Sequence, residues 1–403
     1  MNNLLIIFFV VFFISKFEIS HSQNNEYDQF KSPVFKLDTS RPTMDKPQSK
    51  LFYLDGLWYA ILPGKSGPSL WKRSNNGWIE QKDVTESLLG IPGRIDVFEE
   101  DSVITAVGVD SQYLTVFTII GKKLNTDILW ETKICSNLYP SCDGDKFETA
   151  TITKHKSGRF WVAATAGKKV CVWYSDLSNK NWTGPDIIAE GINEDDICTI
   201  TSLPEGVGVI WSDQENDALK FKLHIQSNEI EIWEETEVII GGGNIANDHL
   251  NTTLSSDSTL WLVSKNSVDE VGKPQLVICE RTKNGNWSHY QYAYRNANEA
   301  PSRPIIISVE ESPELILSGH TIYNFSNRYL GKIVFGWVDT ESKDILKHTI
   351  NAIQPDTAFC FGSNRINDVT GYKKPYPKGV PWIILASDLV GNIYEADVAQ
   401  FFR

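Results

Sequence analysis

Tryptophan recurs along this chain at one long period, and that period constrains the fold more than any other feature. One series runs through Trp78, Trp130, Trp182, Trp233 and Trp287, with gaps of 52, 52, 51 and 54 residues. A regular spacing of this length is the signature of repeated structural units, and it suits one four-stranded blade of a β-propeller. The period therefore predicts that one repeated architecture accounts for most of the chain.

The residues between the tryptophans alternate as short strands do. In segment 147–188, short β-branched and aromatic runs are separated by Gly, Ser, Asn and Asp, as in a four-stranded antiparallel meander. We expect these strands there: Thr149–Thr153, Phe160–Thr165, Val170–Tyr174 and a short fourth run ending at Trp182. A second tryptophan series falls in the second strand of the units: Trp58, Trp161, Trp211, Trp261 and Trp382.

The units predict an all-β fold, a seven-bladed β-propeller of four-stranded antiparallel blades, as a single domain over residues 49–403. The last unit is one strand short, with strands expected at Pro381–Ala386 and Asn392–Val398. The isolated apolar run Pro33–Leu37, within an N-terminal segment of residues 23–48, is expected to supply the missing strand. Strands from both termini then close the ring and leave no open sheet edge. A six-bladed ring with an irregular cap is the alternative.

The first 22 residues have the pattern of a secretory signal peptide. Leu4–Ile14 is apolar throughout and too short to span a bilayer, and Ser20-His21-Ser22 supplies small residues at a cleavage site. A membrane anchor is the alternative. We expect a secreted protein, extracellular or periplasmic, that has no membrane contact after signal removal and is a monomer.

Six cysteines in an exported chain predict disulfide bonds. Cys135 and Cys142 lie close together in an expected loop, so we predict that they form a bridge. The other four fall in apolar strands, as small buried residues do. The chain has no C-x-x-C pair for zinc and no spaced Asp loop for Ca²⁺, so we expect no metal or other cofactor.

The net charge of -13 argues against nucleic acid as a partner. It also gives no general attraction for anionic polysaccharide, so binding of that kind has to come from local basic groups. The partner that we expect is a glycan substrate or ligand.

Unlike polar residues stand before the first strand of successive units. These positions are equivalent in the repeat, so in a propeller they converge on one mouth of the central channel, where a concave polar site is expected. A structural role is the alternative, since Asp and Thr before a strand often hydrogen-bond their own backbone in a turn. Seven turns would use similar residues, however, whereas these differ. The candidates are Lys46, Gln48, Arg94, Glu148, Asp195, Asp196, Asp248, His249, Asn251, Arg303 and Asp368.

Four motifs within this pattern resemble the sialidase-like, BNR-type superfamily of secreted β-propellers. They are Lys46-Pro-Gln-Ser-Lys50, Phe147-Glu-Thr-Ala150, Trp211-Ser-Asp-Gln214 and Asp248-His-Leu-Asn251. The resemblance covers residues 49–398 and implies a carbohydrate-active propeller. The chain departs from true sialidases, because the motif around their first catalytic arginine is missing and their Asp-box is only partly matched by Ser175-Asp176 and Trp182.

Cleavage of an acidic polysaccharide by β-elimination is the leading functional hypothesis. A lyase needs cations to hold a uronate carboxylate and a base to remove the neighbouring proton. Arg94 and Arg303 are the candidate clamps, His249 the base and Asp248 the group that orients it. The substrate-binding candidates are Lys46, Gln48, Glu148, Asp195, Asp196, Asn251 and Asp368.

Two alternatives stay open. A sialidase-like glycoside hydrolase would use two carboxylates as acid and base, and the candidates are Glu148, Asp195, Asp196 and Asp368. A non-catalytic propeller would use the same mouth only to bind a glycan or a protein.

Overall fold

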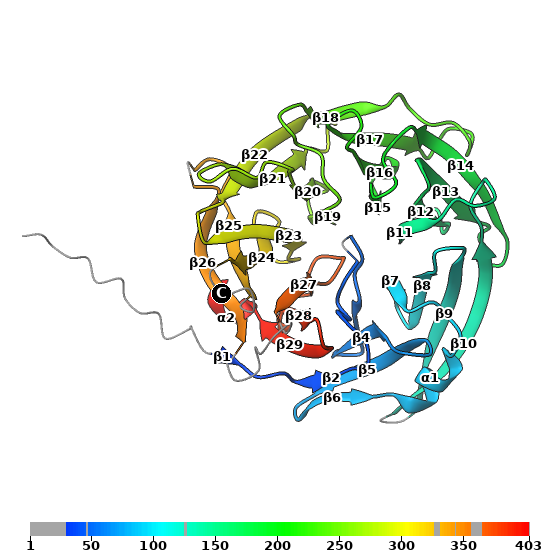
Figure 1. Ribbon diagram of the computed structural model, residues 1–403. Coiled ribbons are helices and arrows are strands. Elements are labelled where there is room, and N and C mark those ends of the chain that lie inside the picture. The colour runs from blue at the N-terminus through cyan, green and yellow to red at the C-terminus, as the bar shows by residue number, and fades with distance from the viewer. Residues whose placement is uncertain are drawn as a thin grey trace, which may run out of the picture.

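The computed structural model describes residues 30–45, 47–124, 127–325, 331–342, 344–355 and 365–402. The strands of these residues form seven sheets, set around a central channel as the blades of a propeller (Figure 1). The predicted fold is confirmed, and the six-bladed alternative is wrong. The calls on the signal peptide, Lys46 and Cys360 fall outside the described residues.

Blades 1 to 3 each have four antiparallel strands, numbered from the channel outward. Blade 1 contains β3 (Leu51–Leu54), β4 (Leu57–Pro63), β5 (Pro68–Ser74) and β6 (Gly77–Glu80). Blade 2 contains β7 (Arg94–Glu100), β8 (Val103–Val109), β9 (Leu114–Leu124) and β10 (Asp127–Leu138). Blade 3 contains β11 (Phe147–Lys154), β12 (Phe160–Ala166), β13 (Lys169–Ser175) and β14 (Trp182–Glu190).

Blades 4 to 6 repeat this order, and a strand from the N-terminal segment is added to blade 6. Blade 4 contains β15 (Cys198–Ser202), β16 (Gly206–Asp213), β17 (Ala218–Ile225) and β18 (Glu237–Gly241). Blade 5 contains β19 (Leu250–Leu254), β20 (Leu260–Lys265), β21 (Pro274–Arg281) and β22 (Trp287–Tyr294). Blade 6 contains β23 (Glu299–Ser308), β24 (Ile316–Asn324), β25 (Gly331–Val338), β26 (Leu346–Pro355) and the parallel strand β1 (Phe30–Lys31). The sequence did not predict β1, because two residues carry no periodic pattern.

Blade 7 joins the two ends of the chain. It contains β27 (Ile366–Thr370), β28 (Ile383–Asp388), β29 (Asn392–Asp397) and the antiparallel strand β2 (Phe35–Lys36). The amide of Val34 donates to the Ile393 carbonyl at 2.8 Å, and the Phe35 ring stacks on Trp71 of blade 1 with centroids 4.2 Å apart. The predicted closure of the ring by strands from both termini is therefore confirmed.

Two short helices complete the described elements: α1 (Lys82–Ser87) and α2 (Ala399–Phe402). The described residues include no helix that is both long and apolar enough to cross a membrane.

The first tryptophan series connects each blade to the one before it. The Trp130 ring packs on Tyr59 with centroids 5.5 Å apart, and Trp287 packs on Phe221 at the same distance. One prediction about this series is wrong, because Trp182 begins β14 instead of ending a strand. Most of β14 is partly or fully exposed, so its sequence lacks the apolar run by which a strand is recognised.

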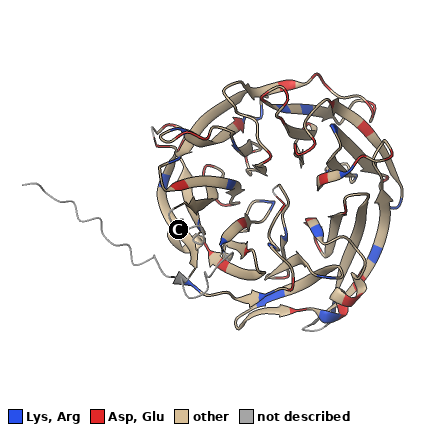
Figure 2. Ribbon diagram, viewed as in Figure 1, with Lys and Arg blue, Asp and Glu red and all other residues tan. Residues whose placement is uncertain are grey.

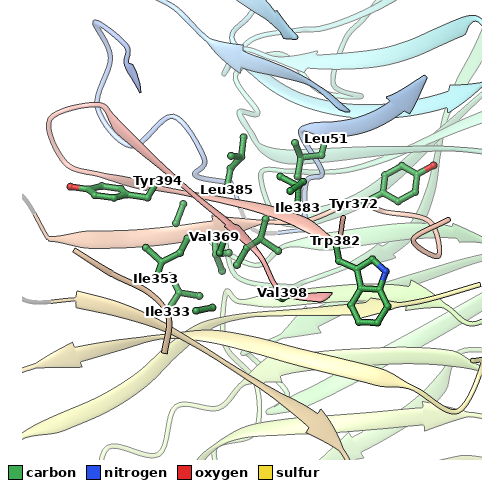
Figure 3. Close-up of a cluster of buried hydrophobic side chains, with 14 of the residues drawn as sticks. Leu51, Ile333, Ile353, Val369, Tyr372, Trp382, Ile383, Leu385, Tyr394 and Val398 are labelled. Atoms are coloured by element: carbon green, nitrogen blue, oxygen red, sulfur yellow. The ribbon is translucent and has the colours of Figure 1, made fainter. Parts of the chain in front are cut away.

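Apolar side chains fill the spaces between blades. The largest buried cluster joins blades 6, 7 and 1, and it includes Ile333 and Ile353 from blade 6, Val369 and Leu385 from blade 7, and Leu51 from blade 1 (Figure 3). Packing of sheet on sheet is what a four-stranded blade requires, because one sheet cannot bury both of its faces.

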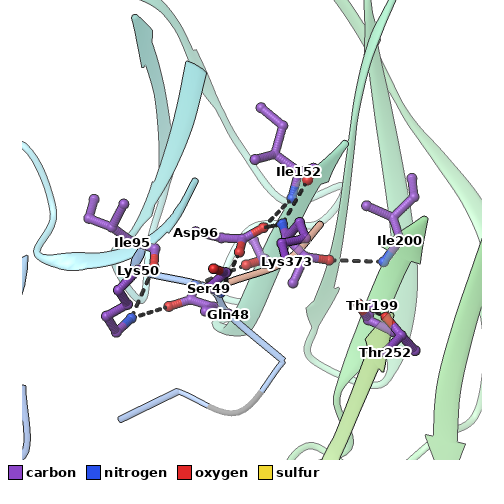
Figure 4. Close-up of polar contacts among 12 residues, drawn as sticks. Gln48, Ser49, Lys50, Ile95, Asp96, Ile152, Thr199, Ile200, Thr252 and Lys373 are labelled. Carbon is purple, nitrogen blue, oxygen red and sulfur yellow. Dashed lines mark hydrogen bonds and ion pairs between the residues drawn. The ribbon is translucent and has the colours of Figure 1, made fainter. Parts of the chain in front are cut away.

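Polar side chains near the channel bridge neighbouring blades at all seven junctions, and we call these side chains the channel belt. They come from the inner strands or their approaches at six junctions, and from the second strand, β24, at the junction of blades 6 and 7. Asp96 of blade 2 accepts hydrogen bonds from the amides of Ser49 (2.8 Å) and Ile152 (2.7 Å), and so connects to blades 1 and 3 (Figure 4). The Lys373 ammonium contacts the same carboxylate. The other five junctions are bridged by Thr151 to Ile200, Thr199 to Thr252, Asn251 to Ile306, Thr321 to Asn367 and Thr370 to Lys50.

The predicted Cys135–Cys142 bridge is wrong: both residues are free thiols. Cys135 lies inside β10, which continues to Leu138, so the segment expected to be a loop is a strand. Its sulfur is 3.9 Å from the Thr118 hydroxyl, while the Cys142 sulfur is 2.9 Å from the Lys169 ammonium.

We predict that Asp96→Asn destabilises the protein by about 1–3 kcal/mol, because it leaves the partly buried Lys373 ammonium without its counter-charge. Asp96→Asn combined with Lys373→Met should cost less than the sum of the two single changes, by about 1–3 kcal/mol. Urea unfolding of the two single variants and the double variant measures this coupling. Strictly additive costs would show that the two side chains do not act as a unit.

Candidate functional site

The inner strands β7, β11, β15, β19, β23 and β27 all begin at one face of the ring, which we call the entrance face. Figure 2 shows charged residues at the inner ends of several blades. A cavity of about 280 Å³, the entrance cavity, opens there, and five predicted site residues line it: Arg94, Glu148, Asp248, Arg303 and Asp368. The other lining residues are Arg41, Met44, Asp45, Thr149 and Ile197. The phase of the repeat thus brought together residues from five blades or their junctions.

Arg94 and Arg303 are held in place by their neighbours. The Arg94 guanidinium donates to the Glu148 carbonyl at 2.9 Å and lies 3.5 Å from the Asp45 carboxylate. Arg303 lies at an irregularity in β23 and has a φ of 49°, a backbone conformation that residues other than glycine rarely adopt. Its Nε donates to Asp368 at 2.8 Å. Both guanidinium groups are therefore oriented before any ligand arrives.

Arg41 is a lining residue that the sequence did not predict. It lies between β2 and β3, in the segment that crosses from the closing strand to blade 1, and its φ is 50°. Within the described part of the chain, its guanidinium makes no hydrogen bond or ion pair. Because Arg41 lies outside the repeat, no periodic signal could have identified it.

Thr149 adds a hydrogen-bonding group to the same cavity. Its side chain is 4% exposed, and its hydroxyl has no hydrogen-bond partner among the described residues. Buried hydroxyl groups are normally satisfied, so an unpaired one in a cavity wall indicates a place for water or a ligand.

Asp248 and His249 are placed the other way round from their predicted roles. The predicted base, His249, would have to face the cavity, but Asp248 does so instead. Asp248 lines the cavity, whereas His249 is 6% exposed and does not line it. The His249 Nδ1 is 2.5 Å from the Asp248 carboxylate and 2.7 Å from the Asn247 side-chain oxygen. The imidazole therefore lies behind Asp248, and Asp248 is the member of the pair that faces the cavity.

Asp195 and Asp196 lie outside the entrance cavity. Asp195 lines a neighbouring cavity of about 410 Å³, which shares Glu148 with the entrance cavity. Asp196 is buried and accepts hydrogen bonds from the Asn193 amide, the Ser212 hydroxyl and Gln214. Burial raises the pKa of Asp196, and these donors act against that rise. Asp196 therefore stabilises the turn before β15, as expected if its role is structural and it does not bind substrate.

Gln48 and Asn251 also have structural contacts. Gln48 is buried and donates to the Ala150 carbonyl at 2.9 Å, and Asn251 belongs to the channel belt. Both face the channel toward its other end, where a cavity of about 400 Å³, the exit cavity, opens.

The exit cavity has its lysines paired with carboxylates. Lys374 contacts Glu99 at 2.9 Å, Lys373 contacts Asp96, and Lys154 contacts Glu100. The rest of its lining is rich in Ser and Thr. The exit cavity therefore offers no unpaired lysine to an anion, whereas the entrance cavity offers Arg41.

The described residues form no ready site for a metal ion. Across the residues that the structure describes, no group of three His, Cys, Asp or Glu side chains is placed to hold a metal ion.

No protein-family model and no curated protein matches the sequence. Two solved structures of a polysaccharide lyase, ulvan lyase, share its fold with TM-scores of 0.54 and 0.55 at 10% sequence identity. In both, the match covers 90% of this chain and 94% of the lyase, and one lyase is bound to a -[GlcA(1-4)Rha3S]- saccharide. A sialidase of Trypanosoma rangeli matches with a TM-score of 0.47 at 10% identity, over 76% of this chain and 58% of that one. The likeness to the ulvan lyase shows a shared β-propeller fold.

Lys50 is a fully buried lysine, and its burial makes the stability of the protein depend on pH. Its ammonium donates at 3.0 Å to Gln48 and to the Ile95 carbonyl, and burial lowers its pKa from 10.5 to about 8 (Figure 4). Below pH 8 the lysine is charged in both the folded and the unfolded chain, so burial costs stability. That cost disappears as the pH rises through 8 to 10.5.

We therefore predict that, between pH 8 and 10.5, the free energy of unfolding of the wild-type protein rises by up to about 3 kcal/mol relative to that of Lys50→Met. Chemical denaturation at several pH values measures the difference. Lys65→Met, at an exposed lysine, is the matched control and should show no such trend. Parallel stability curves for wild type and Lys50→Met would contradict the account.

Proposed function

We propose that the protein is a carbohydrate-active propeller that binds an acidic saccharide in the entrance cavity and cleaves it by β-elimination. One observation carries the proposal: Arg41, Arg94 and Arg303 come from three separate parts of the chain and line one cavity. Arginine suits carboxylate and sulfate groups, because its planar guanidinium can donate two parallel hydrogen bonds. The shared fold with an ulvan lyase bound to a glucuronate-containing saccharide supports the same class of ligand.

The proposed elimination starts from a bound uronate. Arg41 and Arg303 hold the sugar carboxylate and stabilise the negative charge that develops when the neighbouring proton leaves. The proton on carbon 5 passes to a base, a double bond forms between carbons 4 and 5, and the bond from carbon 4 to the bridging oxygen breaks. That oxygen then takes up a proton from water. Asp248 is the base candidate that faces the cavity, and His249 behind it is a positioning residue that fixes the carboxylate and shares its proton.

Hydrolysis is a second candidate, favoured by the carboxylates in the cavity wall. Asp368 is buried against Arg303, and Asp45 lies beside Arg94. Glu148 and Asp248 line the same cavity from different blade junctions, and they are the pair proposed to act as acid and base. The products separate the two reactions, because elimination gives an unsaturated sugar that absorbs ultraviolet light and hydrolysis gives only new reducing ends.

We also propose that the protein is exported, on the basis of the apolar run Leu4–Ile14 and the small residues that follow it. An exported protein meets the extracellular polysaccharides that this site would bind.

We predict that the protein binds at least one of four uronate glycans: alginate, hyaluronan, polygalacturonate and ulvan. Arg41→Ala should weaken that binding by about 10- to 100-fold, because it removes a charged hydrogen bond from the guanidinium to the ligand. Calorimetric titration measures the affinity, and a neutral glucan serves as the ligand control. Arg159→Ala, at a turn on the opposite face, is the matched arginine control. Equal affinity of Arg41→Ala and wild type would overturn the proposal.

Any cleavage should depend on the Asp248–His249 pair. We predict that His249→Ala lowers kcat, with little change in KM, because Asp248 loses the group that positions it. The loss should not exceed the roughly 10²- to 10⁴-fold contribution of the acid–base group itself. The pH–rate profile of the remaining activity should lose the rise or fall in rate that the titration of the Asp248–His249 pair causes. Initial rates across pH measure both effects. A wild-type rate and pH profile in this variant would exclude a role for His249.

A further inference from the structure

A straight row of paired residues crosses the entrance-face edge of blade 2. Arg94 of β7 is paired with Val109, Val109 with Leu114, and Leu114 with Leu138 at the end of β10. Neighbouring strands lie about 4.8 Å apart, so this row runs outward from the channel for roughly 14 Å. It starts at the wall of the entrance cavity and ends at the outer rim of the ring.

Two tyrosines stand at the outer end of this row. Tyr113 precedes Leu114, Tyr139 follows Leu138, and their ring centroids are 6.5 Å apart at an angle of 43°. Tyr139 is 60% exposed, and neither phenol makes a hydrogen bond within the described residues. They border a hollow of about 220 Å³ whose other lining residues are uncharged: Leu89, Gly90, Ile91, Thr115, Ile134 and Asn137.

The hollow is connected to the entrance cavity through the backbone. The Phe147 amide donates to the Ser111 carbonyl at 2.9 Å, so the turn that carries Tyr113 is fixed to the start of β11. The next residue, Glu148, lines the entrance cavity. A backbone hydrogen bond therefore links the turn that carries Tyr113 to the strand whose start lines the entrance cavity.

We propose that Tyr113 and Tyr139 form an outer subsite on which a sugar ring of an extended polysaccharide stacks while an acidic unit occupies the entrance cavity. A sugar ring has an apolar C–H face and a hydroxyl edge, and a tyrosine offers an apolar ring with a polar tip. A hollow of about 220 Å³ has room for one sugar ring. This subsite rests on the proposed function, and it makes the ligand a polymer instead of a single sugar.

The test compares fragments of two and six sugars from the same four glycans by calorimetric titration. Wild type should bind the six-sugar fragment more tightly than the two-sugar fragment. Tyr139→Ala should reduce this advantage by about 3- to 10-fold and leave the two-sugar affinity unchanged. Tyr139→Phe should keep the advantage, because stacking does not need the hydroxyl. Tyr294→Ala, at a 63% exposed tyrosine in blade 5, is the matched control and should behave as wild type.

The outcomes separate the subsite from the proposed function. Equal affinity for both lengths in wild type, an unaffected Tyr139→Ala, or an equal loss at both lengths overturns the subsite. If Arg41→Ala still weakens both lengths in those cases, binding at the entrance cavity stands. A six-sugar affinity that depends on Tyr139 but not on Arg41 supports the subsite and overturns the entrance cavity as the acid-binding site. No binding of any fragment overturns both.

Discussion

The channel belt is the constraint on which both the ring and its candidate site depend. Each inner strand has one edge paired within its blade and one edge turned toward the channel, where its amides need other partners. Belt side chains such as Asp96 and Thr370 supply partners for the amides of Ile152 and Lys50 and so fix one inner strand against the next blade. The spacing of the blades around the channel is thus set by side chain to backbone hydrogen bonds as well as by apolar packing.

The belt also determines which residues reach the entrance cavity. Successive side chains of a strand point to opposite sides, so a residue two positions before a belt residue shares its side. Arg94 precedes Asp96 in this way, and Asp368 precedes Thr370. The same inner strands therefore carry a structural residue in the channel and a polar residue that lines the entrance cavity.

The sequence predicted the fold well because the tryptophan period reports a contact that every unit repeats. It predicted the site less completely, because the phase of a repeat locates a residue along a strand but not the direction of its side chain. Asp248 and His249 are neighbours in sequence, yet only Asp248 faces the cavity. Arg41 escaped prediction because it belongs to the segment that closes the ring, where no repeat exists. Lys373, which completes the contacts of Asp96, lies in an irregular segment after β27 and escaped for the same reason.

A chain of net charge -13 can bind an acidic glycan only through local cations, and Arg41 supplies one at the entrance cavity, whose wall holds three arginines beside the carboxylates of Asp45, Glu148, Asp248 and Asp368. The most direct measurement is a crystal structure of the protein with a uronate hexasaccharide bound. We expect density for a sugar carboxylate within hydrogen-bond distance of Arg41 or Arg303. Density for the saccharide at the exit cavity instead, with the entrance cavity unchanged, would contradict it.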